Sequence, residues 1–272
     1  MATFLFWNLN RKPLEHLLAK MAREHSADVL LLAECEIGYA ALLEALNEGQ
    51  EPKYEMATDF TGEEVVKVLS IFSRDFIVPL YDDGDISIRA LRLPKREEIL
   101  LASAHLPSKL HQDEREQLLT AVRIAALIRE YENQLGHART ILVGDLNMAP
   151  FEPGMVAADA FHAVMSKDIA LKVSRTVRGE KRPYFFNPMW GQLGDAPPGP
   201  PGTYYYNSGK QINYFWNSFD QVLLRPSLLP HFRNEDLMVL TEVAGQSLLT
   251  NNGLPDKSSA SDHLPILFRL SL

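Results

Sequence analysis

The chain has 272 residues, of which 46% are hydrophobic and 23% charged, so it can bury a large core and is not a disordered protein. Its formal net charge of −8 argues against a purely electrostatic grip on long nucleic acid, although a local basic patch is still compatible with it. The single cysteine, Cys35, excludes an internal disulfide and a zinc site built from several thiolates.

Compartment and domain count follow from the same features. No apolar run reaches the roughly 20 residues that a membrane-spanning helix needs. The first residues, MATFLFWNLNRK, lack the basic leader and long apolar segment of a signal peptide. We therefore expect a cytoplasmic protein, with residues 1–272 forming a single domain. The sequence predicts no protein partner.

The first part of the chain alternates short apolar runs with helical patterns. Leu14, Leu17, Leu18 and Met21 recur at helical spacing after Pro13, which is typical of a helix with one buried face. Runs such as SADVLLLA are short, rich in branched residues and typical of buried strands. These patterns predict helices at 13–25 and 39–46 and strands at 3–9, 26–33, 65–72, 76–80, 86–93 and 99–104, the last two paired as a hairpin.

The second part opens with the longest predicted helix, at 112–134. The stretch TILVGDLNMAP follows, and its apolar run Ile141 to Val143 predicts another buried strand. A short helix is predicted at 154–161, and further strands are predicted at 219–224, 238–240 and 264–270. Residues 165–218 are irregular and dense in proline, glycine and aromatic residues. Within them, 194–202 (GDAPPGPPG) is predicted to be a surface loop.

Six of the predicted interior strands carry polar or titratable residues at or near one end. They are FWNLN, VLLLAE, LLASAH, ILVGDLN, FDQVLL and SDHLPILF. A carboxylate at the rim of a core is costly unless it meets a cation or several donors. Six such ends, spread from residue 8 to residue 263, suggest that the polar residues gather at one mouth of a sheet structure and form a site.

Oxygen donors dominate this set, and they favour Mg²⁺, Mn²⁺ or Ca²⁺ as the bound ion. The donors are Asn8, Asn10, Glu34, Asp145, Asn147 and Asp262. His105, His263 and Arg89 add donors for an anionic substrate, and Asp220 can fix the tautomer of an imidazole. Carboxylates, a hard cation, histidine and arginine together are what hydrolysis of a phosphate ester requires.

In their order along the chain, these motifs resemble the endonuclease/exonuclease/phosphatase superfamily, which includes pancreatic deoxyribonuclease, abasic-site endonucleases and sphingomyelinases. The motifs are WNLN at 7–10, Glu34, Arg89, His105, GDLN at 144–147, Phe219-Asp220 and the terminal SDH at 261–263. The resemblance implies the deoxyribonuclease I-like fold, a four-layer α/β sandwich of two packed mixed sheets flanked by helices. It also implies a phosphoester hydrolase that uses Mg²⁺ or Mn²⁺, most often on phosphodiesters in nucleic acid or nucleotides.

The resemblance carries over roles for individual residues. Glu34 matches the main metal ligand, and Asn8, Asn10 and Asp262 match residues around the metal. Asp145 and Asn147 match the positions that orient or activate the attacking water, and Asn147 also contacts the phosphate. His263, oriented by Asp220, matches a base or transition-state stabiliser. His105 matches the phosphate-contacting histidine of the deoxyribonuclease and sphingomyelinase branches, where abasic endonucleases carry tyrosine. Arg89 matches a phosphate-binding arginine.

Other interpretations are compatible with the sequence. Asp145 and Asn147 are also common turn-capping residues. The substrate can equally be a small or lipid-linked phosphate, and a catalytically silent relative would bind nucleic acid or a protein instead. Between the GDLN and FDQ motifs, Trp190 and Asn217 are candidates for a wall that stacks on a base or sugar, while the aromatic residues of this segment can equally pin a long loop to the core.

Overall fold

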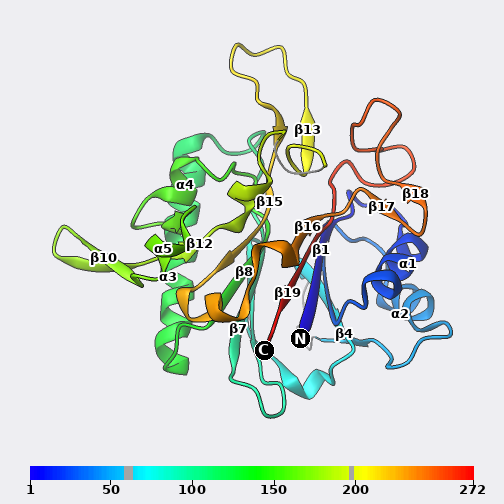
Figure 1. Cartoon of the computed structure of the whole chain (residues 1–272), viewed down its shortest axis with the longest axis horizontal. Helices are drawn as coiled ribbons and strands as arrows, with labels where there is room; N and C mark the ends of the chain where they lie inside the picture. Colours follow the sequence, from blue (N-terminus) through cyan, green and yellow to red (C-terminus); the bar gives the residue numbers. More distant parts are fainter. Residues whose placement is uncertain (58–63, 196–198) are drawn as a thin grey trace.

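Two mixed β-sheets pack face to face in the computed structural model, which describes residues 1–57, 64–195 and 199–272 (Figure 1). The first sheet has the strand order β16-β19-β1-β2-β4-β3 and the second the order β5-β6-β7-β8-β15-β12-β9. The strands of the first sheet are β16 Leu237–Val239, β19 Ile266–Leu270, β1 Ala2–Asn8, β2 Val29–Ala33, β4 Val66–Ser70 and β3 Glu55–Met56. Those of the second sheet are β5 Ile77–Asp82, β6 Ile86–Leu91, β7 Ile99–His105, β8 Thr140–Asp145, β15 Asp220–Leu224, β12 Phe185–Phe186 and β9 Ala163–Val164.

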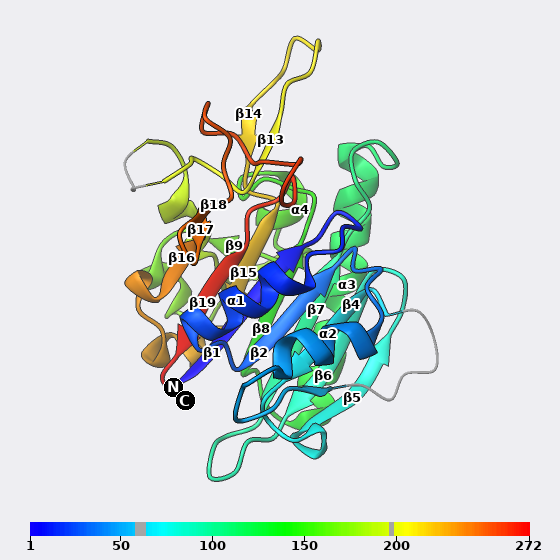
Figure 2. The same ribbon diagram turned by 90° about the vertical axis from the view of Figure 1, so that its right-hand side faces the viewer.

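Helices cover the outer face of each sheet. Helices α1 (Glu15–His25) and α2 (Tyr39–Asn47) lie on the first sheet, as Figure 2 shows, and α3 (Glu114–Leu135) lies on the second. Helix α3 begins at a capping box in which the side chains of Asp113 and Glu116 each accept a backbone N–H of the other residue. The predicted four-layer sandwich of two mixed sheets flanked by helices is therefore confirmed.

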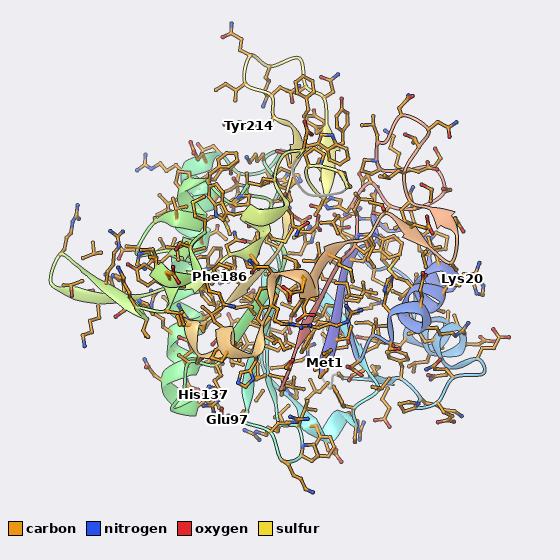
Figure 3. The ribbon with its side chains drawn as sticks, viewed as in Figure 1. Met1, Lys20, Glu97, His137, Phe186 and Tyr214 are labelled. Carbon is orange, nitrogen blue, oxygen red and sulfur yellow. The ribbon has the colours of Figure 1, made fainter. Side chains whose placement is uncertain are left out.

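Alternation along the strands places apolar side chains on both faces of each sheet. In β1, Phe4 and Phe6 point into the core between the sheets, whereas Leu5 and Trp7 point outward beneath the helices. A strand buried on both faces must be apolar at nearly every position. This explains the short continuous apolar runs of the sequence, and Figure 3 shows how densely the side chains, Phe186 among them, fill the space between the layers.

Register in the second sheet sets up the site. Strands β7 and β8 are parallel and pair His105 with Asp145, while β8 and β15 are antiparallel and pair Asp145 with Asp220. Three titratable residues from distant parts of the sequence therefore stand side by side at one end of the sheet. Gly144 lies next to them, and a Cβ atom there would be 1.9 Å from the carbonyl oxygen of Ala104, so only glycine fits.

The remaining elements are short. They are α4 Pro153–Val156, α5 Lys167–Ala170, the hairpin β10 Ser174–Val177 and β11 Glu180–Pro183, the hairpin β13 Tyr204–Tyr206 and β14 Phe215–Asn217, the hairpin β17 Glu242–Val243 and β18 Gln246–Ser247, and the 3-10 turns η1 Arg74–Phe76, η2 Pro188–Gln192, η3 Pro226–His231 and η4 Asn234–Asp236. The hairpin of β13 and β14 projects from the body at the top of Figure 1. None of the helices in the described ranges is long and apolar enough to cross a membrane.

Most of the predicted elements are confirmed, with small shifts at their ends. The helix predicted at 154–161 is confirmed only at its start, because α4 ends at Val156 and the chain then turns so that Ala160 and Phe161 pack against the second sheet. The strands at 65–72 and 76–80 exist as β4 and β5, but they belong to different sheets. Of the loop predicted at 194–202, residues 196–198 lie outside the described part of the chain.

Candidate active site

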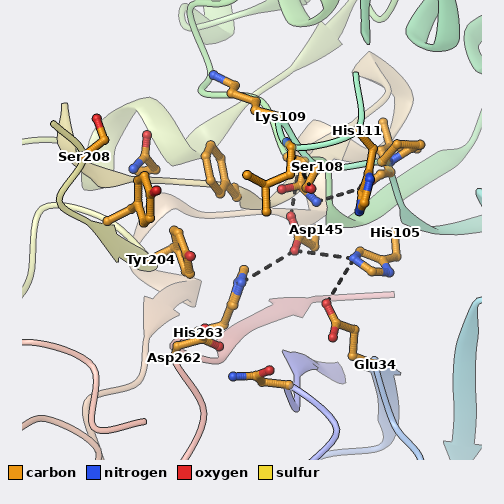
Figure 4. A pocket seen from close by; sticks show the side chains of 18 of the residues that line it. Glu34, His105, Ser108, Lys109, His111, Asp145, Tyr204, Ser208, Asp262 and His263 are labelled. Carbon is orange, nitrogen blue, oxygen red and sulfur yellow. Dashed lines mark hydrogen bonds and ion pairs between the residues drawn. The ribbon is translucent and has the colours of Figure 1, made fainter. Parts of the chain in front are cut away.

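A cavity of about 760 Å³ opens where the ends of β2, β7 and β8 meet the loops that follow β1 and precede β19 (Figure 4). Eight residues that the sequence analysis singled out line it. They are Asn10, Glu34, His105, Asp145, Asn147, Asn217, Asp262 and His263. The polar strand ends therefore converge on one cavity, as their distribution along the sequence suggested.

His263 is held from three sides. Its Nδ1 lies 2.9 Å from Oδ2 of Asp220, its backbone carbonyl accepts the indole N–H of Trp7 at 2.9 Å, and the ring of Tyr204 lies against its imidazole with the centroids 4.6 Å apart. The backbone N–H of His263 also donates to Ser261 Oγ at 3.1 Å. These contacts leave Nε2 pointing toward Asp145, whose Oδ2 is 3.8 Å away.

The charge of His263 follows from this setting. Burial alone would lower the pKa of His263, but the carboxylates of Asp220 and Asp145 outweigh it and raise the pKa to about 10. At neutral pH the ring is therefore an imidazolium, and its Nε2–H can donate a hydrogen bond within the cavity. The resemblance allows His263 to act as a base or as a stabiliser of the transition state. Its positive charge favours the second role, the stabilisation of negative charge.

Asp145 is almost fully buried and has fixed donors. Its Oδ2 accepts the side-chain N–H of Asn8 at 3.0 Å, and its Oδ1 accepts the backbone N–H of Asn147 at 3.0 Å. Burial raises the pKa of Asp145, and the positive charge of His263 opposes part of this rise. The carboxylate is thus rigidly placed and can accept a proton more readily than an exposed aspartate.

Asn147 is positioned through its backbone as well as its side chain. Its Nδ2 donates to the carbonyl of Leu106 at 2.8 Å, and its own carbonyl accepts from Nε2 of Gln117 at 2.9 Å. Its φ of 49° is in the left-handed region, as are those of Asn10 (47°) and Glu34 (44°). Residues in this region cost about 1–3 kcal/mol each and concentrate at functional sites, because surrounding contacts must hold them there.

Glu34 is the carboxylate best placed for a metal. Its Oε1 lies 3.3 Å from the Asn8 amide and 3.5 Å from Nε2 of His105, and its side chain stays a quarter exposed toward the cavity. Since a single amide bridges Glu34 and Asp145, two carboxylates are held close together, an arrangement that a cation stabilises. Asn10 and Asp262 line the same cavity and add oxygen donors. This donor set fits a hard divalent ion such as Mg²⁺ or Mn²⁺.

A second grouping of possible ligand atoms is less suitable. Single atoms of Asp145, Asp220 and His263 all lie within 4.8 Å of one another. However, Nδ1 of His263 is already bonded to Asp220, and Asp220 is fully buried and does not line the cavity, so this trio could hold a metal only if that pair separated. We therefore favour Glu34 over this trio as the metal-binding carboxylate.

Three predicted site residues have different positions from those expected. Asn8 is fully buried behind the cavity, where its Oδ1 accepts the Asn10 backbone N–H at 2.9 Å and its amide nitrogen faces the carboxylates of Glu34 and Asp145. Arg89 points into the core between the sheets, because side chains alternate along β6, and it contacts Glu64 and Ala57 instead of the cavity. Trp190 packs behind Phe151 and does not line the cavity.

Several lining residues were not singled out as site residues. Arg11 follows Asn10 directly, Lys109 follows the His105 motif, and Phe219 precedes Asp220. Tyr204 and Tyr206 of β13 also line the cavity, and they belong to the aromatic segment that the sequence offered as a possible wall. Tyr214, on the projecting loop of the same hairpin, lines it as well (Figure 3). Proximity in sequence to Asn10 and His105 could have suggested Arg11 and Lys109. For the hairpin, the sequence left open whether its aromatic residues form a wall of the site or pin a loop to the core.

Comparison with known proteins agrees with this geometry. Two packed mixed sheets with a carboxylate and histidine site at one end define a class of metal-dependent phosphoester hydrolases. The model of the Endonuclease/Exonuclease/phosphatase family matches residues 5–263, and the chain belongs to this family. It is accordingly a phosphoester hydrolase that depends on a divalent metal. No curated protein matches the chain significantly.

Solved structures share the fold at low sequence identity. The 2′,3′-cyclic phosphatase ANGEL2 is 16% identical with a TM-score of 0.58, and the comparison covers 100% of this chain and 95% of that one. An AP endonuclease from Archaeoglobus fulgidus is 13% identical with a TM-score of 0.56 over 100% of both chains. D. rerio TDP2, complexed with a single strand DNA product, is 14% identical with a TM-score of 0.55 and coverage of 100% and 99%.

Proposed function

We propose that the protein is a Mg²⁺- or Mn²⁺-dependent phosphodiesterase that acts on nucleic acid or nucleotides. One observation carries this proposal: the buried pair of Asp145 and His263, backed by Asp220, faces the same cavity as Glu34. A proton acceptor, a fixed cation and a metal-binding carboxylate are thereby within reach of one phosphate group, which is what displacement at phosphorus needs.

Each residue has a distinct task in this reaction. Asp145 and Asn147 orient the attacking water, and Asp145 takes its proton. His263, kept protonated by Asp220, donates a hydrogen bond to a non-bridging phosphate oxygen. His105, which approaches both Glu34 and Asp145, lies where it can contact the phosphate or protonate the leaving oxygen. A divalent cation held by Glu34, Asp262 and Asn10 would neutralise the charge that develops on the phosphate.

The walls of the cavity support a nucleotide-sized substrate. The rings of Tyr204 and Phe219 stack with centroids 5.5 Å apart, and Tyr206 and Tyr214 extend the aromatic surface along the hairpin. Aromatic side chains bind nucleobases by stacking without much regard to sequence. The volume of about 760 Å³ is ample for one nucleotide. Relatives of similar fold described as an AP endonuclease and as TDP2 with a DNA product fit the same interpretation.

The experiment that tests this proposal compares a diester with a monoester. We expect Mg²⁺-dependent turnover of bis(p-nitrophenyl) phosphate and of a thymidine dinucleotide, with far slower turnover of p-nitrophenyl phosphate. Asp145→Asn should abolish the diesterase activity, while Asp168→Asn, an exposed aspartate on α5, serves as the matched control. Preference for the monoester would show a phosphatase instead, and no metal-dependent turnover of any of the three would contradict the proposal.

Two further proposals concern the chain as a whole. We propose that residues 1–272 act as one catalytic domain, because both sheets contribute side chains to a single cavity. We also propose a cytoplasmic location, which is supported by the use of a single, unpaired cysteine, Cys35, as expected in a reducing compartment.

A further inference from the structure

Arg11 faces the cavity beside the metal-binding carboxylate. Its Nε lies 3.4 Å from Oε2 of Glu34 and 3.8 Å from Oε1 of Glu36, while 69% of its side chain is exposed. Ion pairs of such exposed groups contribute at most about 1 kcal/mol, because water competes for both partners. The guanidinium is therefore held near Glu34 but is not locked there.

The backbone places Arg11 at this position at a conformational cost. Asn10 and Arg11 are consecutive non-glycine residues with φ of 47° and 60°, both in the left-handed region. The backbone N–H of Arg11 donates to the carbonyl of Glu34 at 2.9 Å, and Nζ of Lys12 donates to the carbonyl of Ala260 at 2.7 Å. These bonds fix the turn directly against the residue that binds the metal, so the side chain of Arg11 cannot drift far from it.

Other cations near the site are less available for a substrate. Among the described residues that line the cavity, Arg11 is the one arginine. Lys109 pairs with the buried carboxylate of Glu152 and lies over the ring of Phe219, 5.6 Å from its centroid. Lys210 belongs to the projecting hairpin loop. Arg89, the arginine expected to bind phosphate, is buried between the sheets.

We propose that Arg11 is the arginine that binds the substrate phosphate, and that it exchanges partners when a divalent cation binds Glu34. The guanidinium and a cation would compete for the same carboxylate, and a doubly charged ion at Glu34 would repel Arg11 at close range. The side chain of Arg11, tethered by the turn, would then be free to bind a phosphate at the same cavity. A guanidinium suits this task because its donors match two phosphate oxygens at once. The proposal rests on the phosphodiesterase function proposed above.

The exchange predicts opposite effects of one substitution. In Arg11→Gln, the KM for bis(p-nitrophenyl) phosphate should rise about tenfold or more, since a charge-assisted hydrogen bond to phosphate is lost. The affinity for Mn²⁺ without substrate, measured by calorimetry, should instead increase about two- to fivefold, because no guanidinium competes for Glu34. Arg11→Lys keeps the charge but loses the paired donors, so its KM should lie between those of the wild type and Arg11→Gln. Arg178→Gln, exposed in the distant turn between β10 and β11, is the matched control.

The outcomes separate this proposal from the function on which it rests. If the wild type does not hydrolyse the diester, the proposed function fails and the phosphate contact of Arg11 fails with it, while the Mn²⁺ affinities of the wild type and Arg11→Gln still decide the exchange on Glu34. If the wild type is active, a KM for Arg11→Gln equal to that of Arg178→Gln would overturn the phosphate contact. An unchanged or weaker affinity for Mn²⁺ in Arg11→Gln would overturn the exchange on Glu34.

Discussion

His263 lies between two carboxylates, and this position sets the pH range in which it is charged. Because its pKa is raised above the ordinary value of 6.5 to about 10, it is protonated throughout the neutral range and loses its proton only as the pH rises through about 10. Its carboxylate neighbours supply this shift, with Asp220 in direct contact. A reaction that needs the imidazolium should therefore continue well above pH 7.

Replacing Asp220 tests this charge assignment. In Asp220→Asn one of the charges that raise the pKa of His263 is lost, while burial still lowers it, so the ring should lose its proton at a lower pH. We expect the alkaline limb of kcat/KM for bis(p-nitrophenyl) phosphate, measured with Mg²⁺ between pH 6 and 10, to move toward neutral pH in the variant. An alkaline limb at the same pH in both proteins would show that His263 does not act as a cation.

Side-chain identity predicted much of the site, but the direction of individual side chains was not predictable to the same degree. Glu34, Asp145 and His263 were found because a titratable residue at or near the end of a buried strand is costly without a partner. Arg89 was misplaced because strand order gives its position in the sheet but not its face, and alternation in β6 directs it into the core. Asn8 illustrates the same limit, since the bonds of its amide decide its role and these form only in the folded chain.

At the scale of elements, close contact between β7 and β8 fixes the residue type at position 144. A Cβ atom on Gly144 would lie 1.9 Å from the carbonyl oxygen of Ala104, on the neighbouring strand, so backbone and not a flexible side chain would have to move. Packing against β7 therefore requires glycine at this position of the GDLN motif.

The substitution Gly144→Ala should be strongly destabilising. We expect the free energy of unfolding, measured in urea without metal, to fall by about 3 kcal/mol or more, since overpacking a rigid core position costs this much. Gly191→Ala is the matched control, because a Cβ atom there meets nothing within 4 Å. A loss of less than 1 kcal/mol for Gly144→Ala would mean that the two strands do not approach this closely.

Elements buried in the sandwich were predictable from the sequence, and exposed ones were not. Strands such as β1 and β8 must be apolar on both faces, which leaves a clear signal. The hairpin of β10 and β11 is largely exposed and polar, and that of β13 and β14 reads as an irregular aromatic segment, so neither carries a strand pattern. The wall that β13 and β14 form beside the site depends on tertiary contacts, such as those of Tyr204 with His263 and Phe219.

At the scale of the whole molecule, the net charge of −8 limits how nucleic acid can be bound. Few cations line the cavity, so a strand should make only about two or three phosphate contacts. Each contact adds about 0.7 to the slope of log affinity against log salt for a single strand. Between 50 and 200 mM salt, the KM for a single-stranded oligonucleotide should therefore rise about tenfold.

Steady-state kinetics at several salt concentrations measure how the KM for the oligonucleotide depends on salt. The KM for bis(p-nitrophenyl) phosphate, which should hardly depend on salt, is the comparison. A KM for the oligonucleotide that does not respond to salt would favour a small phosphoester as the substrate. A rise of a thousandfold would require an extensive basic surface that the cavity does not provide.

The central claim is that Glu34 holds a divalent cation beside Asp145 and His263. The most direct test measures the turnover of bis(p-nitrophenyl) phosphate with Mg²⁺ and with EDTA. It compares the wild type, Glu34→Gln and the neighbouring control Glu36→Gln. We predict that EDTA abolishes activity, that Glu34→Gln loses about a hundredfold or more, and that Glu36→Gln, whose side chain is 70% exposed, stays close to the wild type. Wild-type turnover by Glu34→Gln, or activity that persists in EDTA, would contradict the claim.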